Sequence, residues 1–265
     1  MNPRGPCDSG ARLVARTPIV KRRAAEGLNL VHYFLLVDAA DYHQRFHPAL
    51  AASWRTRSFA PCRALCESLL TKIPDFAARY QLQDAETLAA SVVGGLLFDR
   101  TLWHHLVGEV LWYGAVAIPE IPTAEVALTA LLAPEAASAL SLRGRGVGGG
   151  GIPPLSPRGR GVGGEGELPP ILQAHRGSRD LVFGGGYYRP DHAGLNDTDD
   201  VARLATYLGS VDPQGWHASD LAACQALAGE ELEEELADAK AWFPALEELY
   251  RRAARDSCVV VCESL

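Results

Sequence analysis

The chain has 265 residues, of which 48% are hydrophobic, enough to bury the core of one large domain or two small ones. No apolar run reaches the roughly 20 residues of a membrane-spanning helix, so we expect no membrane segment. The net charge of −7 is uneven, because residues 1–27 carry +4 and residues 140–169 carry +2, which leaves −13 elsewhere. Such an acidic body repels phosphate backbones and argues against nucleic acid as the main partner.

Residues 1–28 combine Arg, Pro and Gly without a sustained hydrophobic period, which predicts a disordered extension. Val31 begins the first convincing strand, and a GTG start codon reads as Val inside a longer gene, so the extension could lie outside the native protein. Lys21-Arg22-Arg23 precedes a short apolar run, but no small-residue cleavage site follows it as in a secretory signal. Six cysteines are too few for a dense disulfide framework. We therefore expect a cytoplasmic protein.

The first half of the chain predicts one strand followed by helices. VHYFLLV (31–37) is typical of a short buried strand, and Asp38 to His47 of a short helix ended by Pro48. Ser58 is a plausible cap of the next helix. The apolar stripe of that helix comprises Cys62, Leu65, Cys66, Leu69 and Ile73. Further helices are predicted at 84–94, 99–113 and 123–133.

The second half predicts two more strands and two helices. DLVF (180–183) is a strand, GGG (184–186) a turn and YYRPDHAGLNDTDD (187–200) a polar loop. VARLATYLGSV follows as a helix. The last helix runs from about Glu230 to Arg255, Pro244 should kink or restart it, and CVVVC (258–262) ends the pattern as a strand. The order predicts an α+β (mixed α/β) fold, a small sheet covered by helices in a single domain over 29–265.

A Gly/Arg tract interrupts this domain at 140–170. LSLRGRGVGGGGIPP (140–154) is repeated as LSPRGRGVGGEGELP (155–169) with four substitutions, as a duplicated DNA segment would leave. Its glycines oppose a fixed conformation and its prolines oppose helix. An RNA-binding arm is the functional alternative, but the tract has only four Arg and no aromatic residue for stacking. We expect a disordered insertion.

Cysteine pairs at 62/66 and 258/262 could together supply four thiolates to zinc. A core role is favoured, because the first pair lies in the apolar stripe of a helix and the second on one face of a strand, where free Cys behaves as a small hydrophobe.

His43 and His47 have the i,i+4 spacing of a helical metal site. Pro48 should push His47 out of helical dihedrals, which favours a surface pair beside buried Tyr42 and Phe46. We expect no metal.

The segment DRTLWHHLVGEVLWYG (99–114) places His105, Glu109 and Trp112 along the border of an apolar helical face. A His–carboxylate pair beside an indole could bind a ligand or transfer protons. A structural hydrogen bond at the edge of the core is the favoured interpretation, because such pairs often occur by chance.

FGGGYYRPDH (183–192) could offer the backbone amides of Gly184, Gly185 and Gly186 to an anion. It lacks the Lys-Ser/Thr of a nucleotide loop, and the alternative is a tight turn against which Tyr187 and Tyr188 pack. No hydrolase, metalloprotease, kinase or dinucleotide signature is present, so we expect no cofactor.

Four blocks in order resemble a known family: HYFLLVDAADYHQRF (32–46), FDRTLWHHLVGEVLWYG (98–114), VFGGGYYRPD through DDVARLATYLGSVD (182–212) and KAWFPALEELYRRAARDSCVVVC (240–262). They are similar to the YfbM-like family of bacterial proteins, a domain of unknown function. The resemblance implies a single α+β domain and no activity. It singles out Trp103, His104 and the Gly184–Gly186 turn. The basic extension, the Gly/Arg tract and longer spacing between blocks depart from the family.

The sequence favours a small binding or interaction domain with a protein partner, supported by the acidic body and by aromatic residues expected in loops, Tyr187, Tyr188 and Trp216. The alternative is a hydrolase-like enzyme, metal-assisted or not, that uses a His105/Glu109 pair. The candidate ligand-binding residues are Trp103, His104, His105, Glu109, Gly184, Gly185, Gly186, Tyr187, Asp191 and His192.

Deletion of residues 140–169 should leave the melting temperature nearly unchanged, because a flexible surface tract contributes few contacts to the core. Thermal unfolding of the full chain and of the deletion variant tests this, and loss of folding in the variant would contradict it.

Overall fold

A computed structural model describes residues 32–72, 97–119, 121, 124–137, 168–188 and 193–264, and the statements below concern these residues. The expected extension at 1–28, the helix at 84–94 and nearly all of the Gly/Arg tract lie outside them.

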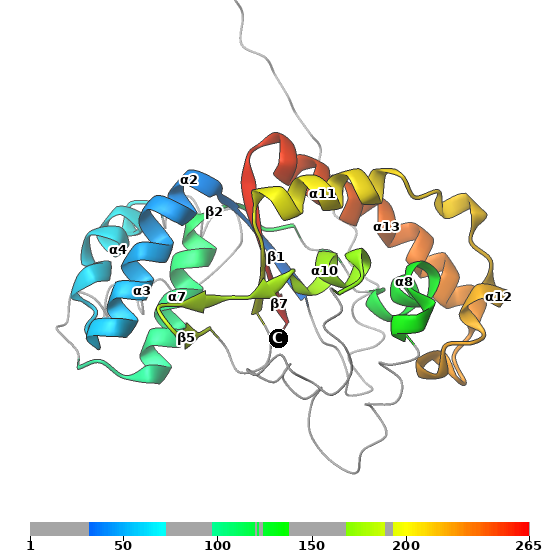
Figure 1. Cartoon of the computed structure of the whole chain (residues 1–265), viewed down its shortest axis with the longest axis horizontal. Helices are drawn as coiled ribbons and strands as arrows, with labels where there is room; N and C mark the ends of the chain where they lie inside the picture. Colours follow the sequence, from blue (N-terminus) through cyan, green and yellow to red (C-terminus); the bar gives the residue numbers. More distant parts are fainter. Residues whose placement is uncertain are drawn as a thin grey trace, which may run out of the picture. The chain divides into compact units, whose positions relative to one another are not determined.

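An antiparallel sheet of five strands lies at the centre of the described structure, in the order β2-β1-β7-β6-β3 (Figure 1). The strands are β1 (His32–Asp38), β2 (Ala115–Ala117), β3 (Arg179–Asp180), β6 (Ala193–Asn196) and β7 (Cys258–Ser264). β1 and β7 pair along their whole length, from His32 opposite Ser264 to Asp38 opposite Cys258. A separate hairpin joins β4 (Val182–Phe183) to β5 (Gly186–Tyr187).

Both faces of the sheet are buried. Side chains alternate between the two faces along β1 and β7, and each face packs into a hydrophobic core. Leu35, Val37 and Val261 enter one core, whereas Phe34 and Leu36 enter the other. The first core is covered by α3 (His47–Thr56), α4 (Arg63–Leu70) and α7 (Arg100–Gly114). The second is covered by α8 (Glu125–Leu132), α10 (Pro170–Arg176), α11 (Thr198–Gly209), α12 (Ala218–Leu221) and α13 (Leu232–Arg255). Figure 1 shows the two groups of helices on opposite sides of β1 and β7.

Short segments complete the described structure: α2 (Ala39–Asp41), the π-helix η1 (Tyr42–Phe46), and the 3₁₀ turns η2 (Ala60–Cys62), η3 (Pro213–Gly215) and η4 (Gln225–Leu227). The α+β prediction is confirmed, as are the strands at β1 and β7 and the helices at α4, α7, α8, α11 and α13. Among the described helices, none combines the length and apolarity that crossing a bilayer requires.

One proline-based prediction is wrong. The chain stays helical past Pro48, and His47 keeps helical dihedrals (φ −57°, ψ −47°). The N–H of His47 bonds to the carbonyl of Tyr42, five residues back, so a widened π turn precedes the proline, which then occupies the first turn of α3. The helix α13 continues through Pro244 without a restart.

The stretch Ala193–Asn196, expected within a polar loop, is the buried strand β6. Its sequence AGLN has no strand pattern, and it is held instead by its neighbours, since β7 pairs along one edge and β3 along the other. A Cβ on Gly194 would lie 1.7 Å from the Arg176 carbonyl oxygen, so only glycine permits α10 to end this close to the strand.

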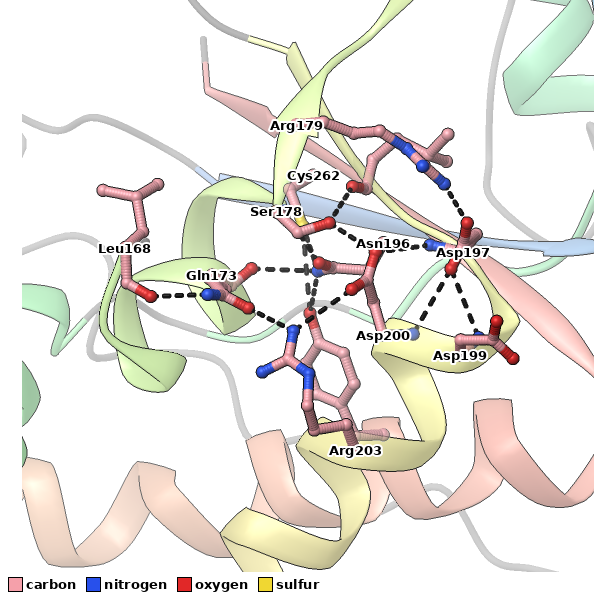
Figure 2. Close-up of polar contacts among 12 residues, drawn as sticks. Leu168, Gln173, Ser178, Arg179, Asn196, Asp197, Asp199, Asp200, Arg203 and Cys262 are labelled. Carbon is pink, nitrogen blue, oxygen red and sulfur yellow. Dashed lines mark hydrogen bonds and ion pairs between the residues drawn. The ribbon is translucent and has the colours of Figure 1, made fainter. Parts of the chain in front are cut away.

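A buried polar network joins β6 to α10 and α13 (Figure 2). The Asn196 Nδ2 donates to the Gln173 carbonyl (2.9 Å) and to the Tyr250 hydroxyl (2.8 Å), while its Oδ1 accepts from the Ser178 N–H (2.8 Å). The Tyr250 hydroxyl donates in turn to the Ala174 carbonyl (2.7 Å). Partnered in this way, Asn196 can be fully buried without the cost of an unsatisfied amide.

His175 of α10 is also buried, and its Nδ1 donates to the Ile171 carbonyl (2.9 Å). Burial lowers the pKa of this imidazole, opposed by the charge of Glu125 and by the hydrogen bond to Ile171. The fold therefore holds the neutral ring. The associated stability is complete above the unfolded pKa of about 6.5 and is lost as the pH falls below it.

We expect the free energy of unfolding to decrease as the pH is lowered from about 7 to about 5, and to decrease less in a His175→Gln variant. His47, whose pKa is also lowered by burial, should retain part of the slope in the variant. Urea unfolding at several pH values measures the pH dependence of the free energy of unfolding of the parent and of the variant. The difference between the two proteins near pH 8, where the imidazole is neutral in both states, gives the part of the destabilisation that does not depend on pH. Equal slopes would contradict the assignment.

Candidate functional site

The Gly184–Gly186 turn of the β4–β5 hairpin lies directly on α3. Gly184 and Gly185 have positive φ values (58° and 91°). A Cβ on Gly184 would lie 2.5 Å from the Ala51 carbonyl oxygen, and one on Gly186 2.4 Å from the Trp54 ring. The glycines are thus required by turn geometry and by close approach to a helix, which supports the tight-turn interpretation.

Beneath the hairpin, aromatic rings from three elements pack together. The Trp103 ring, fully buried on α7, lies 4.7 Å from Trp54 and 6.1 Å from Phe183, measured between centroids. The neighbouring His104 ring lies 6.4 Å from that of Tyr188. The structure therefore brings Trp103, His104 and the glycine turn, distant in the sequence, to one place.

The aromatic residues expected in loops differ sharply in exposure. Tyr188 is 1% exposed and Trp216 8%, so both side chains belong to the cores and neither is available to a partner. Tyr187 is 40% exposed at the end of the hairpin. Alternation along a strand explains the difference, because Tyr188 turns inward where Tyr187 turns outward.

The other candidates on α7 are dispersed. His105 is exposed, whereas Glu109 is half-buried with its Oε2 inside the protein. Trp112 turns toward the sheet, where its Nε1 donates to Oε2 of buried Glu263 (3.3 Å) and its ring meets Tyr33 edge-on at 5.2 Å. This hydrogen bond joins Trp112 to β7 and is a different one from the bond predicted for the His105/Glu109 pair. Asp191 and His192 lie outside the described residues.

The four thiols at 62/66 and 258/262 cannot converge on one metal ion, because the first pair lies in one core and the second pair in the other. Burial, the largest cause, and then the nearby Cys62 and Glu109 raise the pKa of Cys66 to about 12, so this thiol stays protonated. Across the described ranges, His, Cys, Asp and Glu form no group of three that could hold a metal ion.

His47 packs beside Phe183 (5.5 Å between ring centroids) and Tyr42 (5.9 Å), as part of the wall that supports the hairpin. Burial lowers the pKa of His47, against a hydrogen bond with the Val182 backbone. Its half-buried ring therefore contributes to packing, while His43 is exposed.

A surface feature that the sequence reasoning missed adjoins the hairpin. The Arg57 guanidinium lies 4.0 Å above the Trp54 ring and 5.4 Å from that of Phe98. Leu97, which precedes Phe98 in the chain, is 90% exposed. The aromatic–arginine surface, as we name it, comprises Trp54, Arg57, Leu97, Phe98 and Tyr187. Tyr187, which is 40% exposed, is included because it follows Gly186, and Gly186 lies against the Trp54 ring.

No protein-family model and no curated protein matches the chain. Its structure is similar to "The Crystal Structure of a Protein of Unknown Function YfbM from Escherichia coli", with 12% sequence identity, a TM-score of 0.40 and coverage of 89% of this chain and 100% of that chain. YfbM is also the protein after which the family of the four sequence blocks is named. It brings no activity to the chain, since the function of YfbM is unknown.

A Gly186→Ala substitution should destabilise the protein by about 1–3 kcal/mol, because the new methyl group would overlap the Trp54 ring. Gly215→Ala is the matched control, since a Cβ there meets nothing within 4 Å, and it should stay within about 0.5 kcal/mol of the parent. Urea unfolding of both variants measures the difference. Equal stabilities would show that the hairpin does not depend on this contact.

Proposed function

We propose that the protein is a binding domain that recognises another protein through the aromatic–arginine surface. The observation that carries the proposal is the Arg57 guanidinium held over Trp54 and Phe98, with Leu97 90% exposed beside it. Aromatic residues and Arg are enriched in protein interfaces, and Trp, Tyr and Arg dominate their binding energy.

Rigidity supports the proposal as well. Trp54 lies between Arg57 outside and Trp103 inside, and Gly186 lies against its ring, so its position is fixed before any partner arrives. A surface fixed in advance loses little side-chain entropy on binding. Trp103, His104 and the glycine turn act in this proposal as the support of the surface.

The alternative is a hydrolase-like enzyme, and it needs His105 and Glu109 to share a pocket with Asp191 and His192. The binding proposal is favoured over this enzyme, because His105 is exposed whereas Glu109 is half-buried. A cavity of about 230 Å³ is lined by residues that include Leu36, Pro119 and Arg252, and neither His105 nor Glu109 reaches it.

A double substitution, Leu97→Ser with Tyr187→Ser, should abolish capture of the partner, because it removes two exposed apolar side chains from the surface. Val116→Ser with Val126→Ser is the matched control, with side chains of 43% and 40% exposure elsewhere. Immobilised parent, variant and control proteins are incubated with lysate of the source cells, and the bound proteins are identified by mass spectrometry.

We expect the same protein to be captured by the parent and the control but not by the variant. The absence of any reproducible partner, or its retention by the variant, would count against the proposal. Melting temperatures of the three proteins verify that each is folded.

A further inference from the structure

Building on the proposed function, we propose that Arg57 binds a carboxylate of the partner, so that the aromatic–arginine surface selects an acidic segment of protein. The inference rests on how Arg57 is held, on what it leaves unpaired and on the charge around it.

The Arg57 side chain is stacked but not neutralised. Its guanidinium lies over Trp54 and near Phe98, which fixes the plane of the group and covers one of its faces. In the described part of the chain this guanidinium has no ion pair or side-chain hydrogen bond. By contrast, Arg45 pairs with Asp41 and Arg176 with Glu125. Among the described residues, none occupies the N–H groups at its edge, which have the fork geometry that matches a carboxylate.

The backbone of Arg57 also sets the direction of the side chain. Arg57 ends α3 in the left-handed conformation (φ 50°, ψ 46°), with its N–H directed to the carbonyls of Ser53 and Trp54. Glycine is the usual residue at such a position. Ser257, after the end of α13, also has a positive φ (52°), so this backbone feature by itself marks only the end of a helix. Arg57 differs from Ser257 in the stacking of its side chain on aromatic rings.

Local charge favours carboxylates over nucleic acid. The segment WRTRSFAPCR (54–63) contains three Arg and no acidic residue, whereas the whole chain has a net charge of −7. A small basic region attracts a few carboxylates at short range, while the acidic body repels a polyphosphate backbone. Exposed Leu97 provides an apolar contact beside the ionic one. A segment that mixes acidic and large apolar residues fits this surface.

The test measures binding of a fluorescent peptide of alternating glutamate and leucine to the full chain by anisotropy at low salt. Its counterpart with glutamine in place of glutamate is the control probe. We expect the glutamate peptide to bind about tenfold or more tightly than the glutamine peptide, and Arg57→Gln to lose about tenfold or more in affinity. Arg57→Lys should lose most of it too, because an ammonium lacks the planar fork.

Arg251→Gln is the matched control variant, since it removes the same charge from an exposed position of α13 and should keep the parent affinity. Failure of the glutamate peptide to bind, equal affinity for both peptides, or unchanged affinity of Arg57→Gln would overturn the inference. Tighter binding of an oligouridine than of the glutamate peptide would overturn it as well. Melting temperatures show that each variant is folded.

The captured protein separates the two proposals. If the double variant at Leu97 and Tyr187 loses the captured protein but Arg57→Gln retains it, the binding function is supported and the carboxylate inference is contradicted. Absence of any captured protein would count against the binding function, while the peptide measurement would still decide whether Arg57 selects carboxylates.

Discussion

The antiparallel pairing of β1 with β7 is the interaction on which the rest of the structure depends. The seven residues of each strand are matched throughout, and their side chains alternate between the two hydrophobic cores. A shift of one residue would send Leu35 and Val37 into the wrong core, so burial on both faces fixes the register. Because the first described strand pairs with the last, neither core is complete until the whole chain has folded.

The position of the candidate surface follows from this pairing. The chain leaves β1 directly into α2, η1 and α3, and it returns from α7 directly into β2, which pairs with β1. Both helices are therefore held on the same face of the sheet. Close contact reinforces them, since a Cβ on Gly114 at the end of α7 would lie 2.2 Å from the Phe46 ring. The hairpin then rests on a support that the sheet has already fixed.

The sequence predicted those helices and strands whose own residues form a clear apolar pattern. The strands β1 and β7 and the helices α7 and α13 have uninterrupted apolar patterns, and these predictions are confirmed. The strand β6 has no such pattern, because Gly194 and Asn196 are there for contacts with α10 and α13. Pro48 misled for a similar reason, since the π turn before it is visible only in the backbone.

In the candidate site as well, some residues could be identified from the sequence and others could not. The family resemblance indicated Trp103, His104 and the glycine turn, and the structure places Trp103 and His104 beneath the hairpin that contains this turn. The contact between Arg57 and Phe98 could not be predicted from the sequence. Arg57 lies at the end of α3 and Phe98 lies before α7, and hydrophobic periodicity does not relate residues of two separate segments. Exposure of Tyr187 beside buried Tyr188 could have been expected from strand alternation, had β5 been recognised as a strand.

Two polar groups on opposite sides of the sheet, the Asn196 amide and the Arg57 guanidinium, are held in different ways, and this contrast supports the proposed binding function. On the α13 side, Asn196 donates to the Gln173 carbonyl and to the Tyr250 hydroxyl, and Arg203 donates to the Gln173 side chain (2.5 Å). Such a network is internal and gives its energy to the fold. On the α3 side, the Arg57 guanidinium stacks on aromatic rings, and no described residue pairs with its donors. A partner can displace water from donors that the fold orients and leaves unpaired, and this is the physical argument for the proposed binding at Arg57.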